Sequence, residues 1–134
     1  MRIALIPEAG METGAYKALG GYIRSRTGAS VDYFLSREDA LSKNGNRSLL
    51  NTNYAGVVTG AKSGFDVVWK MRHSDNPNHE TPVFVLTDRG HAVYSLLMKT
   101  CMRNGDMYIK YPVNSKGKMK SFFDALPRSN VLMG

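Results

Sequence analysis

The sequence predicts an α/β fold in which a doubly wound, parallel sheet of five strands is covered by helices on both faces. Short apolar runs alternate five times with segments whose apolar residues recur at helical spacing. The apolar runs are continuous, which is typical of parallel strands that are buried on both faces. Crossovers between parallel strands are right-handed, and repeated crossovers of this kind favour an open, doubly wound sheet.

The first strand is predicted at residues 3–6 (IALI), an apolar run that Pro7 stops. A helix should follow and end near Gly28, because six apolar residues recur at helical spacing: Met11, Ala15, Ala18, Leu19, Tyr22 and Ile23. Residues 31–35 (VDYFL) are rich in β-branched and aromatic side chains and predict the second strand.

A second helix is predicted after Ser36, which can cap it, with Asp39 three residues later in an approximate capping box. This helix should carry Leu41 and end near Gly45. Residues 44–53 are polar without a clear period and predict a loop.

The rest of the chain continues the alternation of predicted strands and helices. Strands are predicted at residues 55–59, 83–86 and 107–109, the second of them opened by Pro82. Helices are predicted from three sets of mainly apolar residues at helical spacing. The sets are Phe65, Val68, Trp69 and Arg72; Ala92, Val93, Leu96, Leu97 and Cys101; and Met119, Phe122, Phe123 and Leu126. Pro127 ends the last helix, so residues 1–127 form one predicted domain and 128–134 a tail or the start of a linker.

Composition excludes several classes of protein. The chain has 134 residues, and no segment reaches the ~18 uncharged apolar residues of a membrane span. The N-terminus lacks the apolar core of a signal peptide, so a cytoplasmic protein is expected. Cys101 is the only cysteine, which excludes an internal disulfide and a cysteine-rich zinc site. It lies on a predicted apolar stripe and is expected to be a buried, inert thiol.

The net charge of +7 is the unusual figure. From Lys99 onward the chain has seven basic and two acidic residues, so this end carries most of the excess. Basic proteins bind nucleic acid, acidic proteins or anionic lipid, and net charge alone does not choose among these partners.

Three segments resemble the receiver domain of bacterial two-component response regulators. They are residues 64–72 (GFDVVWKMR), 82–87 (PVFVLT) and 105–112 (GDMYIKYP), and their order and spacing match the family over residues 2 to about 126. The resemblance implies a (βα)5, flavodoxin-like sheet with strand order 2-1-3-4-5. It also implies a role in signal transduction.

The residues that carry phosphotransfer in receivers are altered at the matching positions. The family's acidic pair falls on Pro7 and Glu8, its acceptor aspartate on Thr59, and the lysine before its proline on Tyr111, while Thr87 keeps the family's hydroxyl. Aspartyl phosphate chemistry needs a carboxylate nucleophile and a Mg²⁺ held by several hard oxygen ligands. The sequence therefore predicts a degenerate pocket and a pseudo-receiver, with no catalytic residue, metal or cofactor.

Such a module is expected to act by binding another protein, namely a kinase, an output domain or the transcription machinery. The predicted surface lies on the last strand and its flanking helices: Tyr94, Tyr108, Lys110, Lys116, Lys118 and Lys120. Receivers also dimerise through this face, so a homodimer is an open alternative. Core packing of Tyr108 and simple solvation of the lysines are the plainer interpretations.

Other interpretations remain open. Thr59 is either a phosphosite or a hydrogen-bonded strand cap, and Glu8 and Asp88 either share a metal or are solvated. Residues 60–64 (GAKSG) lack the spacing of a nucleotide-binding loop. The main alternative function is a regulatory protein that binds nucleic acid or the transcription machinery through its basic end. A small α/β enzyme is disfavoured, because no strand end offers a nucleophile beside a base.

Overall fold

A computed structural model describes residues 1–6, 13–42, 47–87, 92–103, 106–110 and 115–126. Five parallel strands form one sheet: β1 Arg2–Leu5, β2 Ser30–Tyr33, β3 Gly56–Thr59, β4 Val83–Thr87 and β5 Met107–Lys110. Their order across the sheet is β2-β1-β3-β4-β5. The predicted fold class, strand number and strand order are confirmed.

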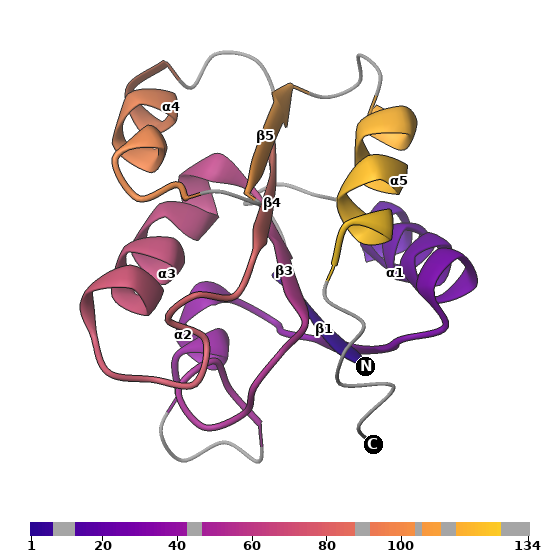
Figure 1. The fold of residues 1–134 in the computed structure, drawn as a ribbon, viewed down its shortest axis with the longest axis horizontal. Coiled ribbons are helices and arrows are strands. Elements are labelled where there is room, and N and C mark those ends of the chain that lie inside the picture. The colour runs from indigo at the N-terminus through magenta and orange to yellow at the C-terminus, as the bar shows by residue number, and fades with distance from the viewer. Residues whose placement is uncertain (7–12, 43–46, 88–91, 104–105, 111–114, 127–134) are drawn as a thin grey trace.

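Helices cover both faces of the sheet. They are α1 Thr13–Thr27, α2 Arg37–Ala40, α3 Ala61–His73, α4 Ala92–Lys99 and α5 Ser115–Asp124. Figure 1 shows α2, α3 and α4 on one side of the sheet and α1 and α5 on the other. None of the helices in the described part of the chain is long and apolar enough to cross a membrane. The tail predicted at 128–134 lies outside the described residues.

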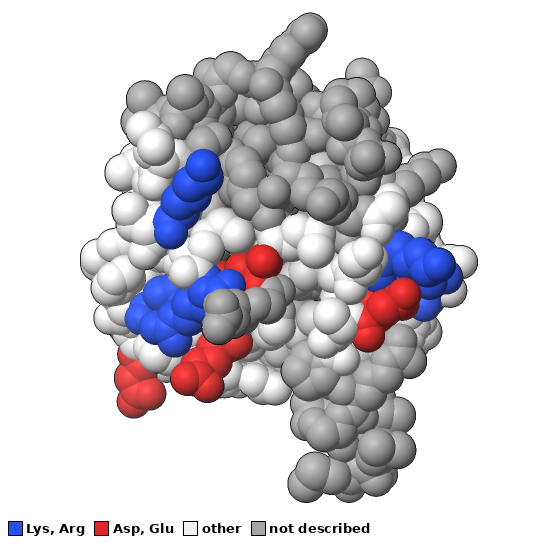
Figure 2. All heavy atoms as spheres, turned by 45° about the horizontal axis from the view of Figure 1, so that its top comes forward, with Lys and Arg blue, Asp and Glu red and all other residues white. Residues whose placement is uncertain are grey.

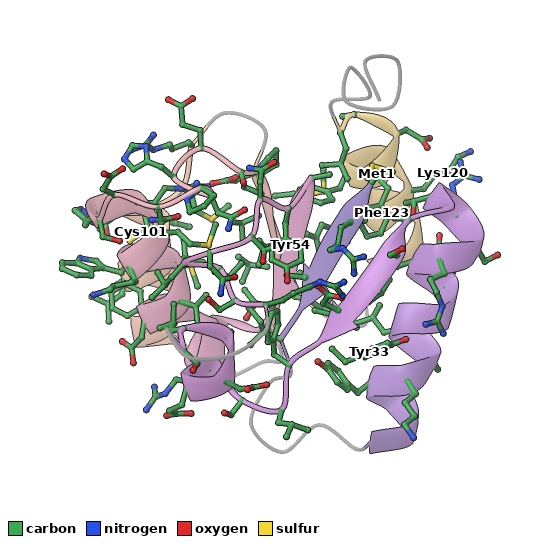
Figure 3. All side chains as sticks on the ribbon, turned by 90° about the horizontal axis from the view of Figure 1, so that it is seen from below. Met1, Tyr33, Tyr54, Cys101, Lys120 and Phe123 are labelled. Atoms are coloured by element: carbon green, nitrogen blue, oxygen red, sulfur yellow. The ribbon has the colours of Figure 1, made fainter. Side chains whose placement is uncertain are left out.

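The sheet separates two apolar cores because neighbouring residues of a strand point to opposite faces. Val57 of β3 belongs to the core under α2, α3 and α4, whereas Val58 belongs to the core under α1 and α5. Phe84 of β4 lies in the second core, edge-on to Phe122 of α5, with ring centroids 5.2 Å apart. Figure 3 shows Phe123, also on α5, within this layer. Burial on both faces explains why the central strands β3 and β4 are continuously apolar in sequence.

Local chemistry accounts for the helix ends. Gly28 follows α1 with a φ of 70°, a left-handed conformation that favours glycine after a helix C-terminus. The Ser36 side chain caps α2 by accepting a hydrogen bond from the Asp39 backbone N–H, and the Asp39 carboxylate accepts one from Leu35 N–H. The predicted capping role of Ser36 is confirmed.

The helix α2 is shorter than predicted, since it ends at Ala40 rather than near Gly45. The Ala40 carbonyl accepts a hydrogen bond from the backbone N–H of Leu49, which returns from the following loop. The last carbonyl of α2 is thus bonded to a residue outside the helix, and Leu41 becomes the C-cap.

Three predicted core positions are instead exposed. The exposed fractions are 47% for Trp69, 67% for Leu96 and 39% for Leu97. Val68 and Met71 bury the inner side of α3, and Trp69 stacks on His73 at 4.5 Å between ring centroids. Among the described side chains of α4 and the turn that follows it, Met98 and Cys101 are the buried apolar ones. Leu96 lies about 200° around the helix from Met98, and so faces away from this core.

Candidate functional site

The carboxyl edge of the sheet is the place where open α/β folds bind ligands, and the predicted pocket belongs there. Thr59 ends β3 and is paired with Val85 of β4. Thr87 ends β4 and is paired with Lys110, the last residue of β5. The register therefore brings the backbones of three predicted site residues, Thr59, Thr87 and Lys110, to one edge.

Thr59 occupies the position of the acceptor aspartate but is not open to solvent. Only 2% of the residue is exposed. Its hydroxyl donates to the carbonyl oxygen of Gly60 at 3.4 Å, a long and weak hydrogen bond. This hydrogen bond caps the strand, and no base contacts the hydroxyl among the described residues, as activation of an alcohol would require.

Gly64 explains why Thr59 is covered. The residue lies in the first turns of α3, and its backbone N–H donates to the Gly60 carbonyl at 2.9 Å. A Cβ at position 64 would collide with the Thr59 hydroxyl and would lie 2.6 Å from its Cγ2. The missing side chain thus lets the start of α3 pack directly onto Thr59.

A second hydroxyl, that of Tyr16 on α1, lies at the carboxyl ends of β1 and β2. It donates to the backbone carbonyls of Leu5 and Phe34, the latter at 2.8 Å. Burial raises the pKa of this phenol well above its ordinary value, and the hydrogen bond to Phe34 only partly offsets the effect. The phenol therefore stays protonated and ties the ends of two strands to α1.

Most of the other predicted site residues have side chains outside the part of the molecule that the structure describes. Pro7, Glu8 and Tyr111 lie outside the described residues, as does Asp88. The structure describes the backbone but not the side chain of six residues: Thr87, Tyr94, Tyr108, Lys110, Lys116 and Lys118. Lys120 is exposed on α5 (Figure 3). Within the described ranges, no three His, Cys, Asp or Glu side chains come close enough together to hold a metal ion.

The opposite, amino edge of the sheet holds a buried ion pair that the sequence interpretation did not anticipate. The Arg72 guanidinium of α3 donates two hydrogen bonds, at 2.8 and 3.0 Å, to the Asp106 carboxylate before β5. The two side chains are 2% and 1% exposed. Arg72 also donates to the carbonyls of Cys101 and His79, and Asp106 accepts from the backbone N–H of Val83. One pair thus joins α3, the end of α4 and the starts of β4 and β5.

A buried amide lies beside this pair. Asn78 is fully buried, and its side-chain NH₂ donates to the carbonyls of Leu49 and Thr52, both at 2.7 Å. Its side-chain oxygen accepts from the Tyr54 backbone N–H at 2.8 Å and from the Thr81 hydroxyl at 3.0 Å. All four bonds hold loops that lead into β3 and β4, so Asn78 fixes where these strands begin.

Asp32 of β2 forms a third polar cluster. Its carboxylate accepts from the guanidinium groups of Arg2 at 2.6 Å and Arg47 at 3.3 Å, and from the Tyr54 hydroxyl at 2.7 Å. Burial and the neighbouring carboxylate raise the pKa of Tyr54 above its ordinary value. Figure 3 shows Tyr54 near the centre of the molecule, seen from below Figure 1.

Signals for two of these groups were present in the sequence. Arg72 falls on the predicted buried stripe of α3, and an arginine in that position requires a buried partner. The partner, Asp106, is 34 residues away, and spacing alone does not identify it. Tyr16 lies inside the predicted first helix, but its bonds to two strand carbonyls depend on the tertiary packing.

The fold was compared with known proteins. No family model matches the chain, and no curated protein matches its sequence. One similar structure is the receiver domain of a sensor histidine kinase from Pseudomonas aeruginosa, which holds a magnesium ion in its active-site cleft. Its sequence is 12% identical to this chain, and the TM-score is 0.66 over 93% of this chain and 95% of the other. A response regulator receiver protein from Pseudomonas putida is 15% identical, with a TM-score of 0.67 over 92% of this chain and 94% of the other.

An archaeal structure gives the same result. A CheY-like receiver domain protein from Methanospirillum hungatei is 17% identical, with a TM-score of 0.64 over 92% of this chain and 94% of the other. Identities this low establish the fold rather than the activity. The chain has the fold of the response-regulator receiver domain over nearly its whole length.

Proposed function

We propose that the chain is a pseudo-receiver: a signalling module of the cytoplasm that is not phosphorylated and that acts by binding another protein. The receiver fold supports the signalling part of the proposal. The state of Thr59 supports the loss of phosphotransfer, and it is the observation that carries the proposal.

Three properties of Thr59 argue against phosphotransfer at the end of β3. The residue offers a hydroxyl where receivers have a carboxylate, and the hydroxyl is buried beneath Gly64. An alcohol becomes a useful nucleophile only beside a base, and none contacts it in the described part of the chain. A Mg²⁺ site would also need several oxygen ligands, whereas the matching acidic pair in this sequence is Pro7 and Glu8.

The proposed docking surface is the side formed by α4, β5 and α5. β5 is the last strand of the sheet, between the ends of the two helix layers (Figure 1). Leu96 and Leu97 of α4 are exposed, and Lys120 of α5 is exposed as well. Exposed leucines together with an exposed lysine suit a protein partner that offers apolar and acidic residues, such as a kinase, an output domain or part of the transcription machinery. A second copy of the chain is the alternative occupant.

Incubation with acetyl phosphate and Mg²⁺, followed by intact-mass measurement, tests the loss of phosphotransfer. The expected result is an unchanged mass for the wild type. A Pro7→Asp/Thr59→Asp variant serves as the matched control, because it restores a second carboxylate and the acceptor while leaving the rest of the chain intact. Phosphorylation of the wild type on a carboxylate would contradict the proposal.

Charge and polarity changes test the docking surface. Leu96→Glu and Lys120→Glu should each abolish cross-linking to a partner in extracts of the producing cell. Trp69→Glu is the control, since Trp69 is an exposed apolar residue of α3 outside the surface. Equal loss of the cross-link in all three variants would remove support for this surface, and a cross-linked species of twice the chain's mass would identify a homodimer.

A further inference from the structure

The strand β2 forms one edge of the sheet, at the end of the strand order opposite to β5, and it pairs with β1 alone. The backbone N–H groups of Ser30 and Phe34 donate to carbonyl oxygens on the β1 side, both at 3.0 Å. Successive residues of a strand direct their N–H and C=O groups to alternate sides. The backbone groups of Val31 and Tyr33 therefore face outward, away from the sheet.

Side chains close both ends of this outer side of β2. The Ala29 N–H donates to the Thr27 hydroxyl at 3.0 Å, and the Leu35 N–H donates to the Asp39 carboxylate at 3.1 Å. Between these two caps, the outward N–H and C=O groups form no hydrogen bond with any residue that the structure describes. An unpaired edge of this kind is a template for one more strand.

The Tyr33 ring holds this edge against α1. It lies edge-on to Tyr16, with ring centroids 5.4 Å apart, and the Arg24 guanidinium lies 5.6 Å from its centroid. A Cβ at position 20 would collide with the Tyr33 hydroxyl, so Gly20 allows the ring to lie close to the helix. Figure 3 shows Tyr33 pointing toward α1. The outer edge of β2 therefore lies beside the flank of α1 that carries Arg24.

The charges on both faces of this edge are mainly positive. Lys17 precedes Arg24 by two helical turns and so lies on the same flank of α1. Both cations are exposed, and neither forms an ion pair with a described residue. On the other face of β2, Arg2 and Arg47 both pair with Asp32, so two cations meet one carboxylate. In the view of Figure 2, the two larger groups of basic side chains each adjoin acidic ones.

We propose that the outer edge of β2 binds an extended, acidic segment of a partner protein, which joins the sheet as an added strand. The free backbone groups of Val31 and Tyr33 supply its hydrogen bonds. Alternate side chains of a strand point to one face, so acidic residues at every second position of the segment meet Lys17 and Arg24. Leu35, which is 89% exposed directly after β2, offers an apolar contact at one end.

A second copy of the chain fits this edge less well. Antiparallel pairing of two β2 strands about a twofold axis would bring the two α1 flanks to the same face of the joined sheet. Each flank carries Lys17 and Arg24, and like charges placed opposite each other are unfavourable. An acidic segment complements the same charges. The inference does not depend on the proposed surface of α4, β5 and α5, which lies at the other edge of the sheet.

Fluorescence anisotropy with a short labelled peptide of alternating glutamate and valine tests the proposal. The wild type should bind it at about 50 mM salt, where exposed charges are weakly screened. The same peptide with N-methylated amides keeps its charge but lacks the backbone donors. It should bind at least about tenfold more weakly.

A proline at the edge tests the backbone contact from the side of the protein. Val31→Pro removes one outward N–H, and proline is tolerated at such a position of an edge strand. This variant should bind the peptide at least about tenfold more weakly than the wild type. Val31→Thr is the matched control, because it keeps the N–H and the branched side chain, and it should bind like the wild type.

Charge removal tests the choice of an acidic segment. Lys17→Ala/Arg24→Ala should weaken binding by about three- to tenfold and reduce its dependence on salt. The control Lys70→Ala/Arg103→Ala also removes one exposed lysine and one exposed arginine, from α3 and from the segment before β5, and should bind like the wild type. Circular dichroism should show that all four variants are folded.

Four results would overturn the proposal. The first is absence of wild-type binding at about 50 mM salt, and the second is equal binding of the two peptides by the wild type. The third is an equal loss in a variant and its matched control. The fourth is a wild-type dimer in sedimentation that Val31→Pro dissociates, since that result would assign the edge to a second copy of the chain.

Discussion

The two edges of the sheet use polar groups in different ways. At the amino edge, a buried ion pair, a fully bonded asparagine and the Asp32 cluster hold the loops that lead into β3, β4 and β5. At the carboxyl edge, the hydroxyls of Thr59 and Tyr16 face backbone carbonyls, and Ser36 and Asp39 accept hydrogen bonds from backbone N–H groups at the start of α2. In receivers the carboxyl edge carries the chemistry. Here the contact between Thr59 and α3 is a packing contact, and the buried ion pair stabilises the other edge.

The largest effect is expected from breaking the buried pair at the amino edge. Arg72→Met leaves Asp106 buried without its cation, which should lower the free energy of unfolding by about 3–5 kcal/mol in urea denaturation. Arg37→Met is the control, because Arg37 forms an exposed ion pair with Asp66 that should contribute at most about 1 kcal/mol. Similar losses in both variants would mean that the amino edge has no special role.

The buried amide should rank next. Asn78→Ala leaves the Leu49 and Thr52 carbonyls and the Tyr54 N–H without their partners, at a cost of about 2–4 kcal/mol. Asn53→Ala is a suitable comparison, since the exposed Asn53 donates one hydrogen bond, to the Pro77 carbonyl. A loss below about 1 kcal/mol for Asn78→Ala would contradict the role given to it.

At the carboxyl edge, the contact between α3 and Thr59 should be tested with a double-mutant cycle. Gly64→Ala forces a methyl group into Thr59 and should cost about 1–3 kcal/mol, even though alanine is the better helix former. Thr59→Ala removes the colliding atoms, so the double variant should recover most of the loss. Additive effects of the two substitutions would show that the residues do not touch.

The tyrosine at the amino edge should make stability depend on pH. Because the pKa of Tyr54 is raised in the folded state, folding favours the neutral phenol. This contribution is complete below about pH 10, the ordinary tyrosine pKa, and is lost as the pH rises above it. Tyr54→Phe should therefore flatten the fall in thermal midpoint between pH 9.5 and about 11, whereas an unchanged slope would contradict the assignment.

The smallest effect is expected at Thr59 itself. Within the described part of the chain its hydroxyl makes one long hydrogen bond, so Thr59→Val should change the free energy of unfolding by less than about 1 kcal/mol. A much larger loss would show that the hydroxyl has partners beyond the Gly60 carbonyl.

The fold could be predicted because its signals are local. β1, β3 and β4 contain continuous apolar runs, and the Ser36 cap and the positive φ of Gly28 are properties of a few neighbouring residues. The burial of Thr59 could not be predicted, because it depends on how closely α3 approaches β3. The pairing of Arg72 with Asp106 joins residues that only the assembled sheet brings together.

The exposed leucines of α4 show a second limit of sequence patterns. An apolar stripe predicts a buried face, but α4 buries only part of its stripe, and Leu96 remains 67% exposed. Periodicity identifies the helix, whereas the neighbour that covers it is a property of the fold. This difference is the reason why the proposed docking surface includes α4.

A magnesium titration followed by thermal unfolding tests most directly the claim that the carboxyl edge has kept its shape without its chemistry. A ligand that binds only the folded state stabilises it by about 2.7 kcal/mol at 100 times its Kd. We predict that the thermal midpoint of the wild type does not change with MgCl₂ beyond the change caused by CaCl₂ at equal ionic strength. A saturable stabilisation by Mg²⁺ that disappears in Glu8→Gln would show a working acidic site and contradict the account.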